Sequence, residues 1–378
     1  MMRVAMVGWE YPPFKAGGLA THCYGLTHGL AGKGVVVDFF MPKTGSSVVS
    51  DVDGVRIVEV GSSSVFPYDR PDDGRLDGGG FFDAVGRYND LVVAKVDSYI
   101  RKHGKYDVIH CHDWLTMKAG LVLKGRWGIP LVVTVHSTEF DRSGWLFPNQ
   151  WFVDVEREGM LGADRVIAVS EYTKRIVVEK YGVDPGRVSV VHNAVYPIPE
   201  GRKSEIVLFL GRLTIQKGVE FFLKAAARVK DFEPGARFVV GGTGDMLPRL
   251  VGQAIDLGIG DRVVFTGRLS DEEVRHIYGV SSVYVMPSVS EPFGIGLLEA
   301  VSAGTPAIVS RTSGVSEVFS NCLRVDFWDT DEMANKIVSL LRYGCLRSVL
   351  SREAGSEVLL FTWDRVGDRT LDVYRGVI

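Results

Sequence analysis

The chain has 378 residues, of which 46% are hydrophobic and 24% charged, and its formal net charge is −3 at pH 7. This length and balance predict a folded globular protein with two domains and exclude an intrinsically disordered chain. The small net charge excludes a general attraction to nucleic acid, so any phosphate binding must come from local groups.

No apolar stretch reaches the ~18 residues that a membrane-spanning helix needs, and the apolar run at the N-terminus is too short for a signal peptide. The four cysteines show no metal-like spacing, which fits buried thiols in a reducing compartment. We therefore expect a cytoplasmic protein without a transmembrane segment.

The first element, residues 3–8, reads as a buried parallel strand that leads into a glycine-rich turn and a helix. Gly17 and Gly18 stand at the start of this helix, where backbone amides without a nearby Cβ can approach a phosphate. Lys15 could neutralise that phosphate. The spacing is not G-x-G-x-x-G, so an ordinary βα turn with a solvated lysine remains the alternative.

Further strands are predicted at residues 35–41 and 55–60, followed by an exposed loop without chemistry at 61–80 and a helix over 81–103. The next strands, 107–110 and 131–135, run into His110-Cys111-His112-Asp113 and into His136. Such positions at the carboxyl ends of strands are where open α/β sheets bind ligands.

His110 and His112 alternate as metal ligands do, yet no third ligand is obvious, so we expect no metal site. Buried, hydrogen-bonded histidines are the simpler interpretation. An aromatic group follows, for which we expect core packing beneath a loop, with a sugar-stacking platform as the alternative; it comprises Phe140, Trp145, Phe147, Trp151 and Phe152.

Strands predicted at 164–170 and 188–192 finish the first half of the chain, with Asn193 on the loop after the second of them. Residues 197–204 have linker composition. The pattern of strand, glycine loop and helix then restarts with a strand at 206–210. The sequence thus predicts two doubly wound α/β domains facing each other across a cleft. The expected segments are 1–196, the linker 197–204, a second domain 205–360, and a final helix 361–378.

Arg212 and Lys217 flank the loop after the first strand of the second domain. A planar guanidinium fork and a point charge together suit a diphosphate, although two solvated cations on a turn are the alternative. Gly241 and Gly242 follow the strand at 238–240 and again permit close backbone approach.

Residues 288–299 carry Glu291 just before a predicted helix and Glu299 within it, after a strand at 283–287. The free amides at a helix start form an anion site. Taken alone, these carboxylates could be a dipole-complementing acid and a surface charge.

Together these motifs resemble the retaining glycosyltransferases of GT-B architecture, in the superfamily of glycogen and starch synthases and of group 1 hexosyltransferases. The resemblance covers nearly the whole chain and rests on Lys15-Ala16-Gly17-Gly18-Leu19, His112-Asp113-Trp114, His136, Arg212-x4-Lys217 and Glu291-x7-Glu299.

The resemblance implies two Rossmann-like domains, with the last helix crossing back to the first. It implies transfer of a hexose, with glucose expected, from a nucleotide sugar to a carbohydrate acceptor such as an α-glucan, without a cofactor or metal. Transfer of mannose or another hexose to a small-sugar, lipid or glycoconjugate acceptor is the alternative. A sugar-nucleotide 2-epimerase is disfavoured by Arg212-x4-Lys217 together with His136, and a silent binding protein by the complete set of motifs.

The resemblance also implies residue roles. Glu291 is expected by the transferred sugar, Glu299 on the nucleotide ribose, and Gly18 near the phosphates. The expected catalytic residues are His136, Asp113, Glu291, Arg212 and Lys217. The expected substrate-binding residues are Lys15, Gly17, Gly18, Asn193, Arg212, Lys217, Gly241, Gly242, Leu269, Phe293, Gly294, Ile295 and Glu299. Phe293 departs from the family, since many glycogen synthases carry cysteine there, which leaves the donor nucleotide and the acceptor open.

Overall fold

The computed structural model describes residues 1–15, 17–43, 50, 52–61 and 78–378. Most of the loop predicted at 61–80 lies outside these residues. The described chain forms two compact units: the first comprises Met1–Thr138, Asn149–Asn193 and Trp363–Ile378, and the second comprises Glu139–Pro148 and Ala194–Thr362. Residues 139–148, expected in the first domain, therefore belong to the second unit.

The first unit is built on a parallel sheet of seven strands in the order β3-β2-β1-β4-β5-β6-β7. Its inner strands are almost continuously buried because helices cover both faces of such a sheet, whereas the edge strands β3 and β7 are only partly buried. The strands are β1 (Arg3–Val7), β2 (Val36–Pro42), β3 (Val55–Val60), β4 (Val108–His112), β5 (Leu131–Val135), β6 (Arg165–Ala168) and β7 (Val188–Val190).

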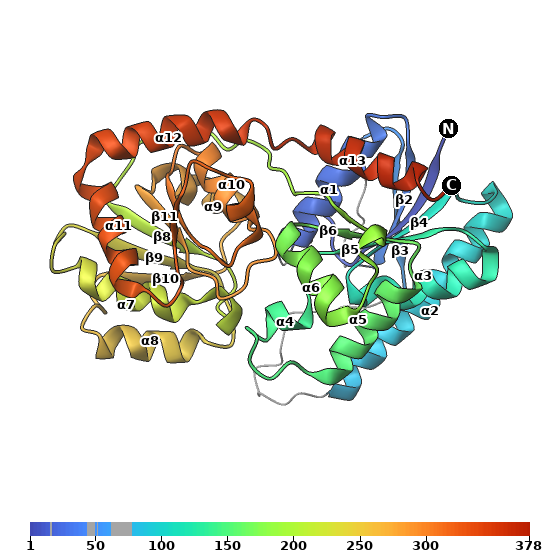
Figure 1. Ribbon diagram of the computed structural model, residues 1–378, viewed down its shortest axis with the longest axis horizontal. Helices are drawn as coiled ribbons and strands as arrows, with labels where there is room; N and C mark the ends of the chain where they lie inside the picture. Colours follow the sequence, from blue (N-terminus) through green and yellow to red (C-terminus); the bar gives the residue numbers. More distant parts are fainter. Residues whose placement is uncertain (16, 44–49, 51, 62–77) are drawn as a thin grey trace. The chain divides into compact units, whose positions relative to one another are not determined.

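Two groups of helices pack with this sheet (Figure 1): α1 lies with α13, whereas α2, α3 and α5 lie together. The helices of the first unit are α1 (Gly18–Ala31), α2 (Gly78–His103), α3 (Trp114–Trp127), α5 (Gln150–Gly162), α6 (Glu171–Tyr181), the short 3₁₀ turn η1 (Pro185–Arg187) and α13 (Trp363–Arg375).

The second unit repeats the plan with a parallel sheet of six strands in the order β10-β9-β8-β11-β12-β13. The last strand was not predicted, because three residues are too few to show a pattern. The strands are β8 (Ile206–Leu210), β9 (Arg237–Gly241), β10 (Val263–Gly267), β11 (Val283–Met286), β12 (Ala307–Ser310) and β13 (Leu323–Val325).

A single apolar core joins this sheet to α7, α8 and α11, and α9, α10 and α12 gather together on the other side (Figure 1). The helices of the second unit are α4 (Glu139–Arg142), η2 (Ile215–Lys217), α7 (Val219–Val229), α8 (Leu247–Asp256), α9 (Asp271–Val280), α10 (Ile295–Ser302), η3 (Gly314–Glu317), α11 (Thr330–Arg342) and α12 (Gly344–Val358). Ser270 and Glu273 form a capping box at the start of α9.

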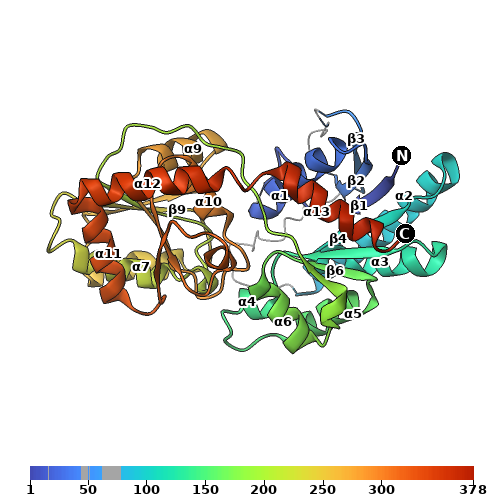
Figure 2. The ribbon, with the colours of Figure 1, turned by 45° about the horizontal axis from the view of Figure 1, so that its top comes forward.

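The last helix, α13, returns to the first unit and runs alongside α1 (Figures 1 and 2), which confirms the expected crossing. Glycines permit this close packing. A Cβ at Gly25 would lie 2.0 Å from the ring of Trp363, and one at Gly29 would lie 2.3 Å from the Trp363 carbonyl oxygen. Lys33 at the end of α1 adds an ion pair with Asp364, 2.5 Å between Nζ and Oδ1.

In each sheet the second and third strands in chain order lie on one side of the first strand, and the later strands lie on its other side. The place where the connections change side is the switch point of the sheet. In the first unit it lies between β1 and β4, and in the second between β8 and β11. Ligands of doubly wound proteins bind at the carboxyl ends of the strands beside this point. The loops after these four strands are therefore where a site is expected in each unit.

Candidate functional site

In the second unit, the loops after β8 and β11 are joined by a buried ion pair. Lys217 Nζ lies 2.7 Å from Glu291 Oε2, and the Ser288 hydroxyl donates to the same carboxylate oxygen at 2.9 Å. The two ionic side chains are only 19% and 10% exposed. The structure thus brings two predicted site residues, 74 positions apart in the chain, into direct contact.

The turn that carries the two cations packs tightly on its neighbours. Gly218 adopts a φ of 64°, and a Cβ there would lie 2.1 Å from the Pro287 carbonyl oxygen, so only glycine fits. Arg212 Nη2 donates to Gln216 Oε1 at 3.4 Å, and the Gln216 carbonyl accepts from the Val289 amide at 2.9 Å. Gln216, the residue before Lys217, thus contacts both Arg212 and the loop after β11.

Two glycines at the end of β9 pack closely on β8 and on the loop that follows it. A Cβ at Gly242 would lie 2.0 Å from the Gly211 carbonyl oxygen, and one at Gly241 would lie 2.6 Å from the side chain of Leu210. The close backbone approach predicted for Gly242 is therefore made to the loop after β8. Leu269 lies after β10 and lines a shallow hollow with Thr266 and His276.

Helix α10 starts after the ion pair. Its N-cap, Gly294, has a φ of 108°, which a side chain would strain, and Phe293 before it is buried. The amide of Leu297 donates to the Gly294 carbonyl at 3.1 Å, and the amides of Ile295 and Gly296 lie before it at the positive end of the helix dipole. Glu299 lies one turn further, partly buried, and accepts a hydrogen bond of 3.2 Å from the Tyr278 hydroxyl.

A contact absent from the sequence predictions also supports this site. The hydroxyl of Ser290 donates to the carboxylate of Asp141 at 2.6 Å, and both side chains are fully buried. Asp141 belongs to α4, within the segment 139–148 that packs with the second unit. The residue beside Glu291 is thus anchored by a segment that precedes it by 149 positions.

In the first unit, Gly17 caps the start of α1, and both Gly17 and Gly18 are exposed. A Cβ at Gly17 would meet nothing within 4 Å, so packing among the described residues does not require glycine there. Lys15 lies just before, partly buried. The start of α1 is thus exposed at Gly17 and Gly18, the residues predicted to approach a phosphate.

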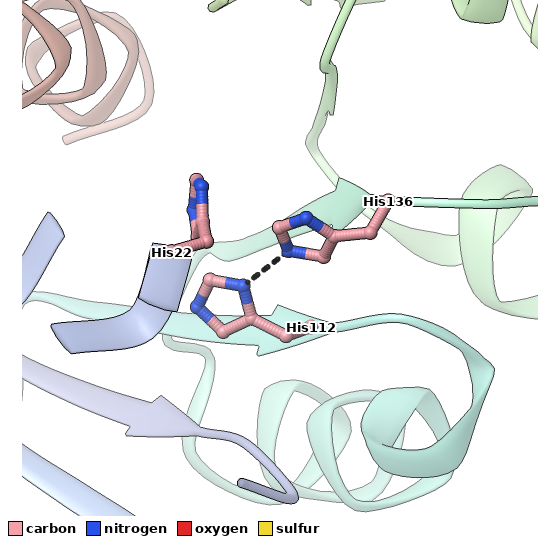
Figure 3. A group of neighbouring side chains, drawn as sticks. All are labelled: His22, His112 and His136. Atoms are coloured by element: carbon pink, nitrogen blue, oxygen red, sulfur yellow. Dashed lines mark hydrogen bonds between the residues drawn. The ribbon is translucent and has the colours of Figure 1, made fainter. Parts of the chain in front are cut away.

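Three histidines gather at the carboxyl end of this sheet (Figure 3). His22 comes from α1, His112 ends β4 and His136 follows β5. His112 Nδ1 and His136 Nε2 are hydrogen-bonded at 3.0 Å, and His22 Nδ1 bonds to Asn193 Oδ1 at 2.6 Å. Sequence reasoning missed His22, because a histidine within an ordinary helix has no distinguishing pattern.

Asp113 positions His136 through the backbone. One of its carboxylate oxygens accepts from the amide of His136 at 2.7 Å and from that of Ser137 at 3.4 Å. Asp113 also has a φ of 57°, a conformation that costs a non-glycine residue about 1–3 kcal/mol and concentrates at functional sites.

His110 has a different environment from the other histidines of the motif. Its Nδ1 bonds to the Tyr374 hydroxyl at 2.6 Å and its Nε2 to the Thr134 hydroxyl at 2.7 Å. Both ring nitrogens are therefore occupied, and His110 ties α13 to the sheet. This part of the motif fits the expectation of a buried, hydrogen-bonded histidine.

Burial keeps these imidazoles neutral. Loss of solvation lowers the pKa of His22 to about 4, despite its bond to Asn193, and lowers the pKa of His110 to about 3. Burial and the neighbouring histidines hold the pKa of His112 and that of His136 well below the usual value. At neutral pH each ring has one N–H donor and one lone pair.

The aromatic group after β5 does not form a core, and that prediction was wrong. Phe147 is 96% exposed, and Trp145 and Trp151 are also exposed. The group is divided: Trp145 packs on Phe140 in the second unit, whereas Trp151 packs on Phe152 in the first. The alternation of aromatic and polar residues could not show this, because the chain passes from one unit to the other within the segment.

Among the described helices, none has the length and apolar character needed to cross a membrane.

Comparison with known proteins identifies the family of the chain. Residues 196–355 match the family described as Glycosyl transferases group 1, and residues 16–197 match that described as Glycosyltransferase Family 4. An uncharacterized glycosyltransferase of Methanocaldococcus jannaschii is 32% identical over 99% of this chain and 98% of its own length.

Two further relatives carry different names. A D-inositol 3-phosphate glycosyltransferase of Acidothermus cellulolyticus is 29% identical over 100% of this chain and 90% of its own. A glycogen synthase of Mycobacterium tuberculosis is 28% identical over 85% of this chain and 80% of its own.

Among solved structures, the sucrose-phosphate synthase from Thermosynechococcus elongatus has the same fold. The TM-score is 0.80 at 23% identity, and the match covers 100% of this chain and 99% of that one. The two parallel sheets with their flanking helices are the GT-B architecture, as predicted.

Proposed function

The chain belongs to the group 1 glycosyltransferases, and we propose that it moves a hexose, with glucose expected, from a nucleoside-diphosphate sugar to a carbohydrate acceptor with retention of anomeric configuration. The observation that carries the proposal is the assembly of Arg212, Lys217, Glu291 and the start of α10 at the switch point of the second sheet. This is a donor site without a metal: two cations and helix amides surround the place for a diphosphate.

The chemistry follows from where charge develops. As the bond between the anomeric carbon and the phosphate oxygen breaks, negative charge grows on the leaving diphosphate. Lys217, Arg212 and the first amides of α10 stabilise that charge more in the transition state than in the ground state. The acceptor oxygen bonds to the same face of the anomeric carbon, and its proton goes to the leaving phosphate oxygen.

The carboxylates have separate roles in this scheme. Glu291, before α10, faces the sugar and stabilises the positive charge that develops at the anomeric carbon. Glu299, a turn into α10, accepts hydrogen bonds from the ribose hydroxyls. In the first unit, His136, held by Asp113, contacts the transferred sugar, and Gly18 donates an amide near the phosphates.

Two acceptor classes follow from the relatives. The inositol phosphate transferase aligns with the whole chain, which favours a small phosphorylated polyol or sugar as acceptor. The glycogen synthase aligns with less of it, and an α-glucan is the second candidate.

A donor-by-acceptor screen tests the proposal. UDP-, ADP- and GDP-hexoses are incubated with a glucan, with inositol phosphate, with hexose phosphates and without acceptor. We expect release of nucleoside diphosphate only where donor and acceptor are both present, with the anomeric configuration of the product retained by NMR. A changed sugar without release would mean an epimerase, and absence of turnover in every arm would overturn the proposal. Lys217→Ala is the inactive control.

A further inference from the structure

The three histidines of Figure 3 form an unusual group, because each is neutral and buried or half-buried, and their rings converge. One nitrogen of each ring lies within 4.8 Å of a nitrogen of the other two. We propose that His22, His112 and His136 form a binding site for a divalent transition-metal ion of the zinc class. This departs from the expectation of no metal site, which rested on His110 and His112 lacking a third partner.

The spacing suits such an ion. Zinc binds imidazole nitrogen at about 2.0–2.1 Å in a tetrahedron, so neighbouring ligand nitrogens stand roughly 3.3 Å apart. His112 Nδ1 and His136 Nε2 are already 3.0 Å apart. The three ligand nitrogens lie within 4.8 Å of one another, so shifts of roughly 1.5 Å bring them to the spacing of a tetrahedral site. The ion then replaces the hydrogen bond between His112 and His136.

Unsatisfied nitrogens provide a second, independent observation. Nε2 of His22 and Nε2 of His112 are both buried, and neither has a hydrogen-bond partner among the residues that the structure describes. A buried polar atom without a partner costs about 1–3 kcal/mol. An ion held by His22 through Nε2 and by His112 through Nδ1 would use the buried lone pair of His22, and the proton of His112 would then be on Nε2.

The hydrogen bond to Asn193 fixes the tautomer of His22 that leaves Nε2 able to bind a metal ion. The Asn193 amide oxygen accepts the hydrogen bond from His22 Nδ1, so the proton of the neutral ring is on Nδ1 and the lone pair is on Nε2. An oxygen acceptor on the second ring nitrogen is typical of metal-binding histidines, since it fixes the tautomer and the ring orientation.

The remaining groups near the cluster explain why the site has three protein ligands. Both nitrogens of His110 are bonded, to Tyr374 and Thr134, and the carboxylate of Asp113 holds the backbone of His136. Three histidines with a fourth position open to water are the coordination of catalytic zinc sites. His136, which is partly exposed, gives the ion a route in.

An ion bound here would occupy the His136 ring, which contacts the sugar in the proposed reaction, so zinc should inhibit transfer. Only this expected inhibition rests on the proposed function. The binding itself is tested on the metal-free full-length chain carrying Cys345→Ser, which removes the exposed thiol. We expect one Zn²⁺ per chain by calorimetry and a tetrahedral visible spectrum with Co²⁺.

Variants identify the ligands. His22→Ala and His112→Ala should each weaken Zn²⁺ binding at least ~100-fold, and Asn193→Ala about 10- to 100-fold. His28→Ala, on the same helix as His22, is the matched control and should bind as the parent does. Asn193→Asp keeps the acceptor and adds a charge, so it should bind more tightly, a gain that misfolding cannot produce.

Equal affinity in His22→Ala and His28→Ala, or absence of binding in the Cys345→Ser parent, would overturn the proposed site. The two proposals fail separately. Zinc binding in a protein without transfer activity would overturn only the proposed function, and active transfer without zinc binding would overturn only the metal site.

Discussion

Lys217 Nζ and Glu291 Oε2 are 2.7 Å apart. The two residues follow β8 and β11, which are neighbours in the second sheet although two other strands separate them in the chain. The carboxylate is thus the counter-ion of the lysine. In the proposed function, a diphosphate that binds Lys217 would compete with Glu291 and free its carboxylate, so we expect donor binding to change the position of Glu291.

The first prediction concerns the two cations. Lys217→Ala should lower kcat/KM about 100-fold or more, because a charged donor at a developing anion contributes ~3 kcal/mol. Arg212→Lys should also lose most activity, since a point charge cannot replace a planar fork. Steady-state kinetics measure both. Activity within about threefold of wild type in both variants, as for a surface charge, would contradict the assignment.

The second prediction separates the two carboxylates. Glu299→Ala should weaken binding of free nucleoside diphosphate, because ribose contacts exist equally in the ground and transition states. Glu291→Ala should bind the diphosphate at least as tightly as wild type, since it removes the competing counter-ion of Lys217, yet turn over slowly. Calorimetric titration beside kinetics checks this. The opposite pattern would mean that the roles of the two residues are exchanged.

The third prediction compares one substitution at two helical glycines. Gly29→Ala should lower the free energy of unfolding by about 1–3 kcal/mol through overpacking, because its Cβ would lie 2.3 Å from the backbone of α13. Gly125→Ala in α3 meets nothing within 4 Å and should raise it by about 0.5–1 kcal/mol. Denaturant titration measures both, and equal effects would contradict the close packing of α1 on α13.

The fourth prediction is a pH dependence of stability in the metal-free protein. Burial lowers the pKa of His110 to about 3 from 6.5, so below pH 6.5 the unfolded chain binds a proton that the folded chain does not. The free energy of unfolding should therefore fall as pH drops, by up to about 1.4 kcal/mol per pH unit for such a histidine. Denaturation at pH 7.5 and 5.5 should show a smaller fall in His110→Gln than in wild type. The exposed His103→Ala variant should show the same fall as wild type.

Much of the architecture followed from local pattern. Strand 131–135 is a buried apolar run, and strand 55–60 combines apolar residues with Arg56 and Glu59; the structure has both at the predicted residues. The restart at 206–210 after a linker predicted the duplicated fold, which the two sheets confirm. The loops carrying Arg212 and Glu291 could be placed because the carboxyl ends of parallel strands share one edge of a sheet.

What the sequence determined by itself was thus the order of the elements, the fold they make and the loops that carry polar groups, because these depend on periodicity and on short-range turn chemistry. Only the tertiary structure decided the partners: Lys217 with Glu291, Asp141 with Ser290, and His22 with His112 and His136. Such pairings depend on how strands and helices far apart in the chain pack, and a single sequence contains no local pattern for a contact across 149 residues.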